Sequence, residues 1–346
     1  MLLRRDEFLA KLESLRPGLS SKEILEQSAS FVFQSGQAYT FNGEVACRCP
    51  SGLEIGFQGA VRADKLLNVL RKRPEEELEI VTKPGSFSIT SKERSTEFHA
   101  EEEIKLPVSY VQAPDPDSWT SLDDNFAEAV FLAKECAGKD HANFLVTCVH
   151  LHPHRIEATD TCQVICCEVT TGVEKPLLVR RDSIKHLVGL PIDGYSLTQG
   201  AGGASWAHYR ASTGLVLSFS CWPLETEVNL AKHLECSGIS LKLPKGVKLA
   251  AELAGEFSSE NPIETNLVRV DLVKNKILIE GAGITGCHRE KKKLDYLGPP
   301  VSFYMSPKLL ADIADRYTEL QVCGNPPDRL KVEGDGWKYV SFLTRA

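Results

Sequence analysis

A short amphipathic helix is the clearest pattern in the chain. In the stretch 61–70, Leu66, Leu67 and Leu70 recur at the spacing that places side chains on one face of a helix. Asp64 suits the first turn, because a carboxylate there meets unpaired backbone N–H groups. The polar face is made by Lys65, Asn68 and Lys72.

This helix pattern recurs at 179–184 and again at 305–310, at intervals of about 120 residues. Each copy is followed by three segments that alternate apolar and polar residues, which is typical of half-buried antiparallel strands. These segments are 78–81, 86–89 and 95–99; 195–197, 206–209 and 215–219; and 319–322, 329–332 and 338–342. The chain is therefore predicted to contain three copies of one unit.

The length of 346 residues suits three domains better than a single core. The proline-rich stretch 113–118 reads as a linker, and 223–227 marks a second junction. We therefore expect domains at 1–114, 118–224 and 228–346. Each contains two helices over an antiparallel sheet, so the predicted fold class is α+β.

Further elements follow from the same patterns. Helices are expected at 6–16, with Phe8, Leu9, Leu12 and Leu15 inside; at 125–137, with Phe126, Ala129, Val130 and Ala133 inside; and at 244–257, with Val247, Ala250, Leu253, Ala254 and Phe257 inside. Strands are expected at 30–33, 38–41, 53–57, 144–150, 155–158, 164–169, 239–243, 267–273 and 276–280.

Composition excludes several classes of protein. Apolar content of 42% and charged content of 25% are ordinary for a soluble domain, and no apolar run approaches the ~20 residues that a membrane helix needs. The first residues turn charged at once, so we expect no signal peptide. Eleven cysteines without a CxxC pair indicate reduced thiols and a cytoplasmic protein. A net charge of −7 argues against a protein that simply coats nucleic acid.

Motifs for catalysis give no positive support for an enzyme. The GxGxxG match at 281–286 lacks the apolar helix that a dinucleotide site needs, so it is expected to be a hairpin loop. His150, His152 and His154 share one strand face but are interpreted as surface histidines rather than a zinc site. Cys162, Cys166 and Cys167 are read as small core residues. No metal, cofactor or catalytic residue is predicted.

Basic residues are distributed in a more informative way. Each of the six expected helices carries or adjoins cations away from its apolar face: Lys11, Lys22, Lys65, Arg71, Lys72, Lys134, Lys139, Arg180, Arg181, Lys185, Lys245, Lys248 and Lys308. Any one of them suits a solvated surface. If the helices share one side of the molecule, they form a positive track that binds phosphates without reading bases.

At this point the chain resembles the bacterial replicative sliding clamp, the β subunit of DNA polymerase III, or a phage-borne relative. The resemblance rests on Ala158-Thr159-Asp160, on 179–182, on 306–310 and on the apolar C-terminal stretch 339–346, together with the threefold repeat. It implies a head-to-tail homodimer, in which six domains close into a ring around double-stranded DNA. It also implies a non-enzymatic, cytoplasmic, nucleoid-associated processivity factor that binds the replicative polymerase, the clamp loader and repair proteins. No membrane partner is implied.

The resemblance further implies a pocket between domains 2 and 3 for partner peptides. Carried over to this chain, its lining would be Leu145, Thr159, Thr161, Val164, Pro223, Val340, Phe342, Leu343, Thr344 and Arg345. The DNA-facing set would be Lys11, Lys22, Lys65, Lys72, Lys134, Arg180, Arg181, Lys185, Lys245, Lys248 and Lys308. The chain departs from the family at Thr161-Cys162-Gln163, where the family has glycine and arginine. The proposed pocket residues would suit an ordinary inter-domain core equally well.

Two alternatives stay open from the sequence. The first is an interaction protein with a clamp fold that does not encircle DNA. The second is a metal- or nucleotide-dependent enzyme that uses the His150–His154 face or the 281–286 loop. A dimeric mass in solution favours the clamp over the first alternative, and stoichiometric metal in the purified protein would favour the second.

Overall fold

The fold is described from a computed structural model, which covers residues 1–139, 142–200, 203–225, 230–260 and 266–345. The chain forms two compact units. Unit 1 contains Met1–Ile156 and Val169–Thr226, and unit 2 contains Glu157–Glu168 and Glu227–Ala346. The expected junction at 223–227 lies partly outside the described residues, and the three predicted domain limits stay a prediction.

Unit 1 contains two successive sets of helices and strands. Its strands are β1 (Leu2–Arg4), β2 (Ser30–Gln34), β3 (Gln37–Phe41), β4 (Val45–Pro50), β5 (Gly59–Arg62), β6 (Glu77–Lys83), β7 (Ser86–Thr90), β8 (Ser95–His99), β9 (Thr120–Ser121), β10 (Cys148–His152), β13 (Leu177–Arg180), β14 (Ile192–Gln199), β15 (Ser205–Ala211) and β16 (Val216–Pro223). Its helices are α1 (Arg5–Ser14), α2 (Ala63–Lys72), α3 (Phe126–Cys136) and α4 (Arg181–Ile184), with 3₁₀ turns η1 (Arg16–Gly18), η2 (Val108–Tyr110), η3 (Phe144–Thr147) and η4 (Lys185–Leu187). The boundary between the units falls within β11 (Arg155–Thr159).

The strands of unit 1 make two antiparallel sheets. One has the order β1-β6-β7-β8, and the other runs β5-β2-β3-β4-β16-β13-β10. The pairing of β4 with β16, from Val45 opposite Phe219 to Arg48 opposite Val216, joins strands from the first and second sequence repeats. The sheet therefore continues from one repeat to the next.

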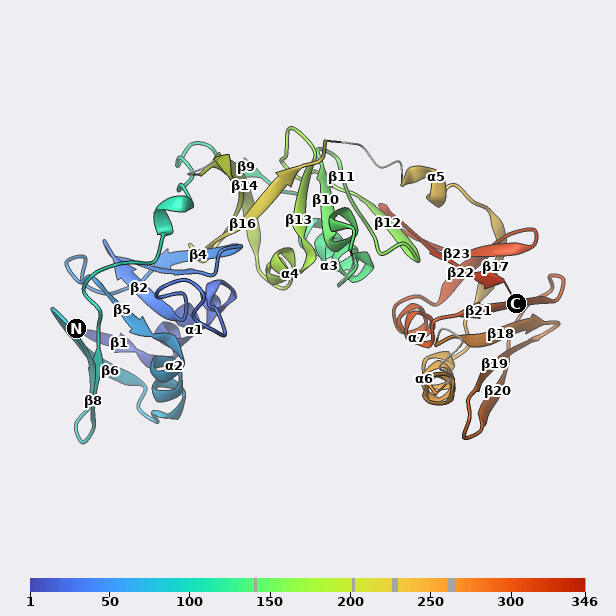
Figure 1. Cartoon of the computed structure of the whole chain (residues 1–346), viewed down its shortest axis with the longest axis horizontal. Coiled ribbons are helices and arrows are strands. Elements are labelled where there is room, and N and C mark those ends of the chain that lie inside the picture. The colour runs from blue at the N-terminus through green and yellow to red at the C-terminus, as the bar shows by residue number, and fades with distance from the viewer. Residues whose placement is uncertain (140–141, 201–202, 226–229, 261–265, 346) are drawn as a thin grey trace. The chain divides into compact units, whose positions relative to one another are not determined.

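The helices of unit 1 pack in pairs, α1 beside α2 and α3 beside α4 (Figure 1). Phe8 and Leu12 of α1 and Leu66, Leu67 and Leu70 of α2 are buried, as the sequence predicts. The core beneath α1 is aromatic. It packs the rings of Phe8, Phe33, Phe57 and Phe87 together with neighbouring centroids 5.9–6.5 Å apart, and Phe87 stacks on Phe8 and Phe33.

Unit 2 repeats the same plan. Its strands are β12 (Gln163–Glu168), β17 (Gly238–Lys242), β18 (Val268–Val273), β19 (Lys276–Ala282), β20 (Cys287–Lys293), β21 (Val301–Met305), β22 (Glu319–Gly324), β23 (Pro327–Gly334), β24 (Trp337–Phe342) and β25 (Thr344–Arg345), and its helices are α5 (Ala231–Leu234), α6 (Val247–Ser258) and α7 (Pro307–Arg316). The sheets have the orders β17-β22-β23-β24-β12 and β20-β19-β18-β21-β25. Strand β12, which the sequence assigns to the second repeat, pairs with β24 of the third.

The helix α6 differs from its predicted orientation. Ala250, Ala251 and Ala254 are buried, whereas Leu253, expected inside, is 40% exposed. The reason is a close approach of α6 to β19, since a Cβ built on Gly281 would lie 1.8 Å from the Ala254 carbonyl oxygen. Small residues permit that approach, so the larger leucines turn away from the sheet.

Other predictions fail for related reasons. Residues 53–57 form a loop, not a strand, because Leu53 and Phe57 anchor it in the core while Ile55 is 80% exposed. The segment 144–150 begins as the 3₁₀ turn η3 before it becomes β10. The sequence did not predict strands β1, β4, β5, β9, β13, β20, β21 and β25. The remaining expected helices and strands are confirmed within three residues at their ends, except that α7 and β16 continue six and four residues past their predicted ends.

The histidine and cysteine interpretations need correction. His150 and His152 are buried in β10, and only His154 is exposed, so they are not surface histidines as a group. Cys162 is exposed rather than in the core, while Cys167 is buried. The 281–286 segment is the turn between β19 and β20, as predicted.

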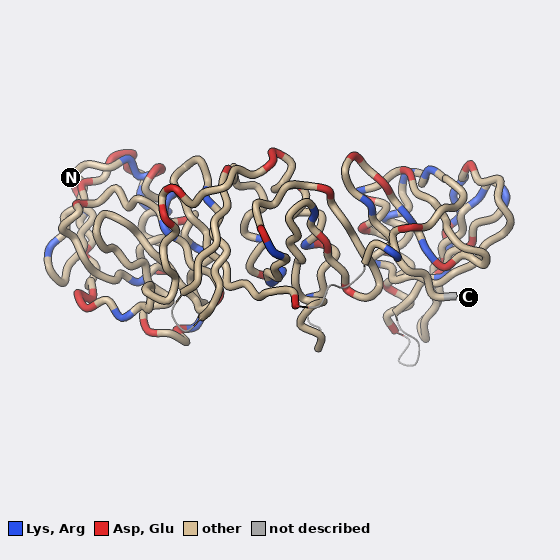
Figure 2. The backbone as a smooth tube through the Cα atoms, turned by 90° about the horizontal axis from the view of Figure 1, so that it is seen from above, with Lys and Arg blue, Asp and Glu red and all other residues tan. Residues whose placement is uncertain are grey.

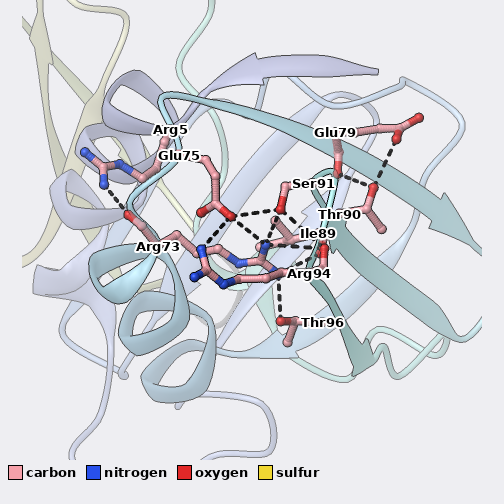
Figure 3. Close-up of polar contacts among 9 residues, drawn as sticks. All are labelled: Arg5, Arg73, Glu75, Glu79, Ile89, Thr90, Ser91, Arg94 and Thr96. Carbon is pink, nitrogen blue, oxygen red and sulfur yellow. Dashed lines mark hydrogen bonds and ion pairs between the residues drawn. The ribbon is translucent and has the colours of Figure 1, made fainter.

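A buried arginine fastens α2 to the four-stranded sheet of unit 1 (Figure 3). The Arg73 guanidinium is 5% exposed, and its Nη2 donates to the Ile89 carbonyl oxygen at 3.0 Å and to Thr96 Oγ1 at 2.8 Å. Its Nη1 donates to Ser91 Oγ at 3.2 Å and lies 3.8 Å from the Glu75 carboxylate. A buried guanidinium is tolerated because these acceptors replace its water.

The Glu75 carboxylate completes this cluster. Its own backbone N–H, followed by the Ser91 hydroxyl, lowers the pKa of Glu75 to about 2. A lowered folded pKa stabilises the protein above the ordinary pKa of 4.5, and that contribution is lost as the pH falls towards 2.

Replacing Arg73 with methionine tests the cluster. Arg73→Met keeps much of the side-chain volume but takes the buried donor away from the Ile89 carbonyl oxygen and Thr96 Oγ1 and a nearby cation away from Glu75, so we expect a loss of about 3 kcal/mol in the free energy of unfolding. Urea denaturation curves measure it. The matched control is Arg71→Met two positions earlier, where an exposed ion pair with Glu13 is removed and less than about 1 kcal/mol should be lost. Equal losses in the two variants would show that the buried cluster is not stabilising.

Candidate DNA-facing and peptide-binding surfaces

The first group of predicted DNA-facing cations lies on α1, α2 and the segment that follows α1. Lys11 on α1 and Lys65 and Lys72 on α2 are exposed, and only Lys65 has a nearby carboxylate, Asp64 at 3.9 Å. Lys22 is exposed in the irregular segment between η1 and β2. Three of these four cations therefore have no ion pair within the described residues.

The second group, on α3, α4 and the end of β13, is largely neutralised by neighbouring residues. Lys134 is 15% exposed beside Glu135, and its ammonium lies 4.8 Å from the centre of the Phe131 ring. Arg181 is 13% exposed and donates from Nε to the Lys134 carbonyl oxygen at 2.6 Å. These two side chains hold α4 against α3 as well as supplying charge.

The other two cations of this group are more accessible. Arg180 pairs with Glu44 at 2.6 Å, and Lys185 pairs with Asp182 at 3.0 Å. The hydrogen bond from Lys185 lowers the pKa of Asp182, so that carboxylate stays ionised. Their positive charge is thus partly cancelled at short range.

The third group lies in unit 2. Lys245 precedes α6, and Lys308 is in the first turn of α7; both are exposed, and neither has an ion pair within the part of the chain that the structure describes. Lys248 of α6 instead pairs with Asp315 of α7 at 2.9 Å. Figure 2 shows that cations and anions are interspersed along each unit. The unpaired lysines therefore sit within a mixed surface rather than a uniformly basic one.

The first half of the candidate peptide site is a tight turn after β11. The backbone N–H groups of Cys162 and Gln163 both donate to Asp160 Oδ1 at 2.9 Å, and Thr159 Oγ1 donates to the Gln163 carbonyl oxygen at 2.7 Å. Thr161 has φ = +78°, in the left-handed region that favours glycine. The turn thus keeps the conformation of a glycine position although the side chain there is threonine.

The second half is the pairing of β12 with β24. Val164 lies opposite Val340, and both are buried against Leu230 and Leu234, which flank and end α5. The half-buried Phe342 ring stands edge-on to His233, with ring centres 5.4 Å apart. Burial, followed by the charge of Lys232, lowers the pKa of His233, which favours a neutral ring beside Phe342.

The end of the chain borders this group. Leu343 is 8% exposed, and its N–H donates to the Asp328 carbonyl oxygen at 2.8 Å. Thr344 is exposed and lies opposite Tyr304, while the backbone of Arg345 lies opposite Phe303. The structure therefore brings together Thr159, Thr161, Val164, Val340, Phe342, Leu343 and Thr344 within unit 2.

The remaining two predicted pocket residues belong to unit 1. Leu145 is half-buried in η3, where its carbonyl oxygen lies 2.9 Å from His150 Nε2. Pro223 ends β16 opposite Leu177 and is exposed. Their place in a common pocket with the residues of unit 2 stays a prediction.

Sequence reasoning missed α5 as part of this site. Leu230 and Leu234 are four positions apart and follow directly on the junction, which is the spacing of one apolar helix face. With only one turn of helix, that signal was too short to separate from a linker.

The described residues give no support to the metal-dependent or nucleotide-dependent enzyme that the sequence left open. No group of three or more histidine, cysteine, aspartate or glutamate side chains suitable for a metal occurs among the described residues. The glycines at 281–286 are followed by a strand, which offers no helix N-terminus to a dinucleotide. None of the described helices is long and apolar enough to cross a membrane.

Comparison with known proteins gives a consistent fold. No family model and no curated protein sequence matches the chain. Solved structures do match over their whole length. A DnaN sliding clamp, DNA polymerase III subunit β, from Pseudomonas aeruginosa bound to griselimycin is 12% identical with a TM-score of 0.79, covering 100% of this chain and 99% of that one.

Two further structures agree. The DNA polymerase III β subunit of Thermotoga maritima and the β subunit of the DNA polymerase of Streptococcus pyogenes are each 14% identical to this chain with a TM-score of 0.79. In both cases the match covers 100% of this chain and 99% of the other chain. The chain therefore has the three-domain, α+β fold of bacterial sliding clamps, as the resemblance in its sequence implied.

Proposed function

We propose that this protein is a DNA sliding clamp, a processivity factor without catalytic activity of its own that encircles duplex DNA and tethers a polymerase. The observation that carries the proposal is the likeness to bacterial clamps along the entire chain, combined with exposed, unpaired lysines on or beside helices in both units. Such lysines attract phosphates weakly and without sequence preference. A closed ring needs no stronger contact, because it leaves DNA only when an interface opens.

Ring closure requires a head-to-tail dimer, and two sheet edges are suited to form it. Strand β8 is an edge strand of unit 1 and carries an exposed Glu97, followed by exposed Glu101, Glu102 and Glu103. Strand β20 is an edge strand of unit 2, and its residues Arg289, Lys291 and Lys293 are exposed. An acidic edge facing a basic edge of a second copy favours antiparallel or parallel strand addition between protomers.

Charge reversal on β20 tests this interface. The double variant Lys291→Glu with Lys293→Glu should shift the solution mass from a dimer towards the 38.2 kDa of a single chain, because like charges would face each other. Sedimentation equilibrium at micromolar concentration measures it. The matched control, Lys175→Glu with Lys338→Glu, changes the same charge at exposed positions outside both edges and should stay dimeric. A wild-type protein that is already monomeric would favour an interaction protein that does not encircle DNA.

Topological retention tests the DNA partner. After loading onto nicked circular plasmid by a clamp loader, the protein should co-elute with the circle in gel filtration and should be released when the plasmid is cut once. The reason is that a ring slides off an end but cannot leave a closed circle. Salt near 0.5 M should change this little, since screening weakens phosphate contacts and not topology. Equal retention on circular and linear DNA would contradict encirclement.

The peptide site of unit 2 is proposed to bind short apolar segments of the polymerase, the clamp loader and repair proteins. Its support is the half-buried Phe342 ring, which packs on the buried Val164–Val340 pair and presents apolar surface near the turn at Thr161. Leu145 and Pro223 are proposed to complete it. The departures at Thr161-Cys162-Gln163 would alter partner preference rather than remove the site.

Truncating the apolar wall tests this proposal. Phe342→Ala combined with Leu343→Ala should weaken a labelled polymerase C-terminal peptide by at least tenfold, because a buried aromatic anchor contributes about 2 kcal/mol or more. Fluorescence anisotropy measures the affinity, and sedimentation should still report a dimer. Leu297→Ala, at an 86% exposed position of the same unit, is the control and should bind normally. Unchanged affinity in the double variant would remove this assignment.

A further inference from the structure

A cavity lies within unit 1, where strands β4 and β16 of the first two sequence repeats pair in one sheet. It measures about 240 Å³ and is lined mainly by apolar side chains, among them Phe41, Val108, Val111 and Val216. We call it the Arg48 pocket. It contains none of the residues discussed above as a peptide or DNA site.

Strand register explains how the pocket forms. Tyr39 of β3 lies opposite Arg48 of β4, which lies opposite Val216 of β16. In the next row on the same sheet face, Phe41 lies opposite Ala46, and Ala46 lies opposite Ser218. The segment around η2 covers these two rows, because Val108 and Val111 pack on the cluster that contains Phe41 and Ala46.

The corresponding strand pair in unit 2 carries larger side chains. There Val164 of β12 lies opposite Val340 of β24, one repeat later than Ala46 and Ser218, and Leu230 and Leu234 cover the pair. Where unit 2 has two valines, unit 1 has an alanine and a serine. The smaller side chains leave space that the covering segment does not occupy.

The uncharged polar groups at the pocket are held by hydrogen bonds, and Arg48 is the charged group beside them. Thr198 Oγ1 donates to the Gln112 carbonyl oxygen at 3.1 Å, so the hydrogen bond of 2.7 Å between Thr198 and His208 has His208 Nε2 as its donor. His208 Nδ1 then accepts from Ser218 Oγ at 2.7 Å. Burial, together with the nearby Arg48 charge, lowers the pKa of His208 to about 4, which leaves a neutral imidazole at pH 7.

Arg48 is therefore the one charged group among the lining residues at neutral pH. It is half-buried, and the described residues provide it with no ion pair or hydrogen bond. A guanidinium partly removed from water beside apolar surface favours a carboxylate that can accept from it in a bidentate manner.

Volume limits what can enter. An engineered cavity of about 150 Å³ binds benzene, whereas sites for complete small-molecule ligands span about 300–1,000 Å³. At about 240 Å³, the pocket has room for one aromatic or branched side chain with an adjacent small group. That is the size of a peptide anchor.

We propose that the Arg48 pocket is a second peptide-anchoring site, which takes an aromatic or aliphatic side chain beside a carboxylate from a protein partner. The apolar group enters between the sheet and the η2 segment, and the carboxylate pairs with Arg48. The site goes beyond the proposed clamp function and does not depend on ring closure or on the Phe342 wall.

A matched ligand pair tests the pocket. N-acetylphenylalanine carries the aromatic ring and a carboxylate, and N-acetylphenylalaninamide carries the same ring without the charge. Ligand-observed NMR titration of the full chain should give at least about tenfold tighter binding of the carboxylate, as expected for a charge-assisted hydrogen bond.

Three variants identify where the ligand binds. Arg48→Gln should remove the preference for the carboxylate, and Ala46→Leu should weaken both ligands about tenfold or more by filling the cavity. The Phe342→Ala, Leu343→Ala double variant should bind both ligands as the wild type does, which separates this site from the proposed peptide site of unit 2. Thermal unfolding of each variant verifies that it is folded.

Several results would overturn the proposal. These are the absence of binding by either ligand, equal affinity for the two ligands in the wild type, or affinities that Arg48→Gln and Ala46→Leu leave unchanged. Loss of binding in the Phe342 and Leu343 double variant would assign the ligand to unit 2 instead. None of these outcomes bears on whether the protein encircles DNA.

Discussion

Antiparallel pairing between strands of successive repeats is the constraint on which the rest of the structure depends. Strand β4 of the first repeat pairs with β16 of the second, and β12 of the second pairs with β24 of the third. In each case a strand near the middle of one repeat meets the last long strand of the next. The backbone hydrogen bonds of these edges are thereby satisfied within the chain, and the helix pairs keep a regular relation to the sheet inside each unit.

Small residues determine how closely the helices approach the sheets and where cavities remain. Gly281 lets α6 approach β19, and the alanines of α6 make that contact while Leu253 turns outward. Ala46 and Ser218 line a cavity where the first two repeats meet, whereas the equivalent strand pair of unit 2 carries the larger Val164 and Val340, buried against Leu230 and Leu234. The same architecture thus supports different surfaces because side-chain volume varies at equivalent register positions.

The sequence predicts the repeated parts of the fold well. The helix at 63–72 follows from the helical spacing of its leucines, the strands β6, β7 and β8 after it follow from alternating apolar and polar residues, and the fold class follows from the recurrence of this order. The prediction from sequence fails where buried and exposed residues alternate in a loop rather than in a strand. Leu53 and Phe57 alternate with exposed Ile55 as a strand would, yet they anchor a loop. His150 and His152 look polar in sequence but are buried in β10.

The candidate sites divide in the same way. Turn residues such as Thr159 and Asp160 are visible in the sequence because their hydrogen bonds are local. Leu230 and Leu234 belong to a single helical turn, and only tertiary packing on Val164 and Val340 reveals their role. Arg48 was not singled out at all, since its isolation from carboxylates depends on strands distant in the sequence. Local signals can be read along a chain, whereas the absence of a partner can be seen only in three dimensions.

Strand β12 belongs to the second repeat in sequence but to a sheet of unit 2 in the structure, and this limits where the chain can be cut into folded fragments. A cut at the sequence junction near residue 225 would separate β24 from its neighbour and leave a long row of backbone donors and acceptors open to solvent. Fragments that follow the repeat boundaries would therefore expose an unpaired strand edge and tend to aggregate. A fragment of unit 2 that includes residues 157–168 would keep this edge paired. The boundaries of the duplicated sequence unit therefore differ from the boundaries of the parts that could fold independently.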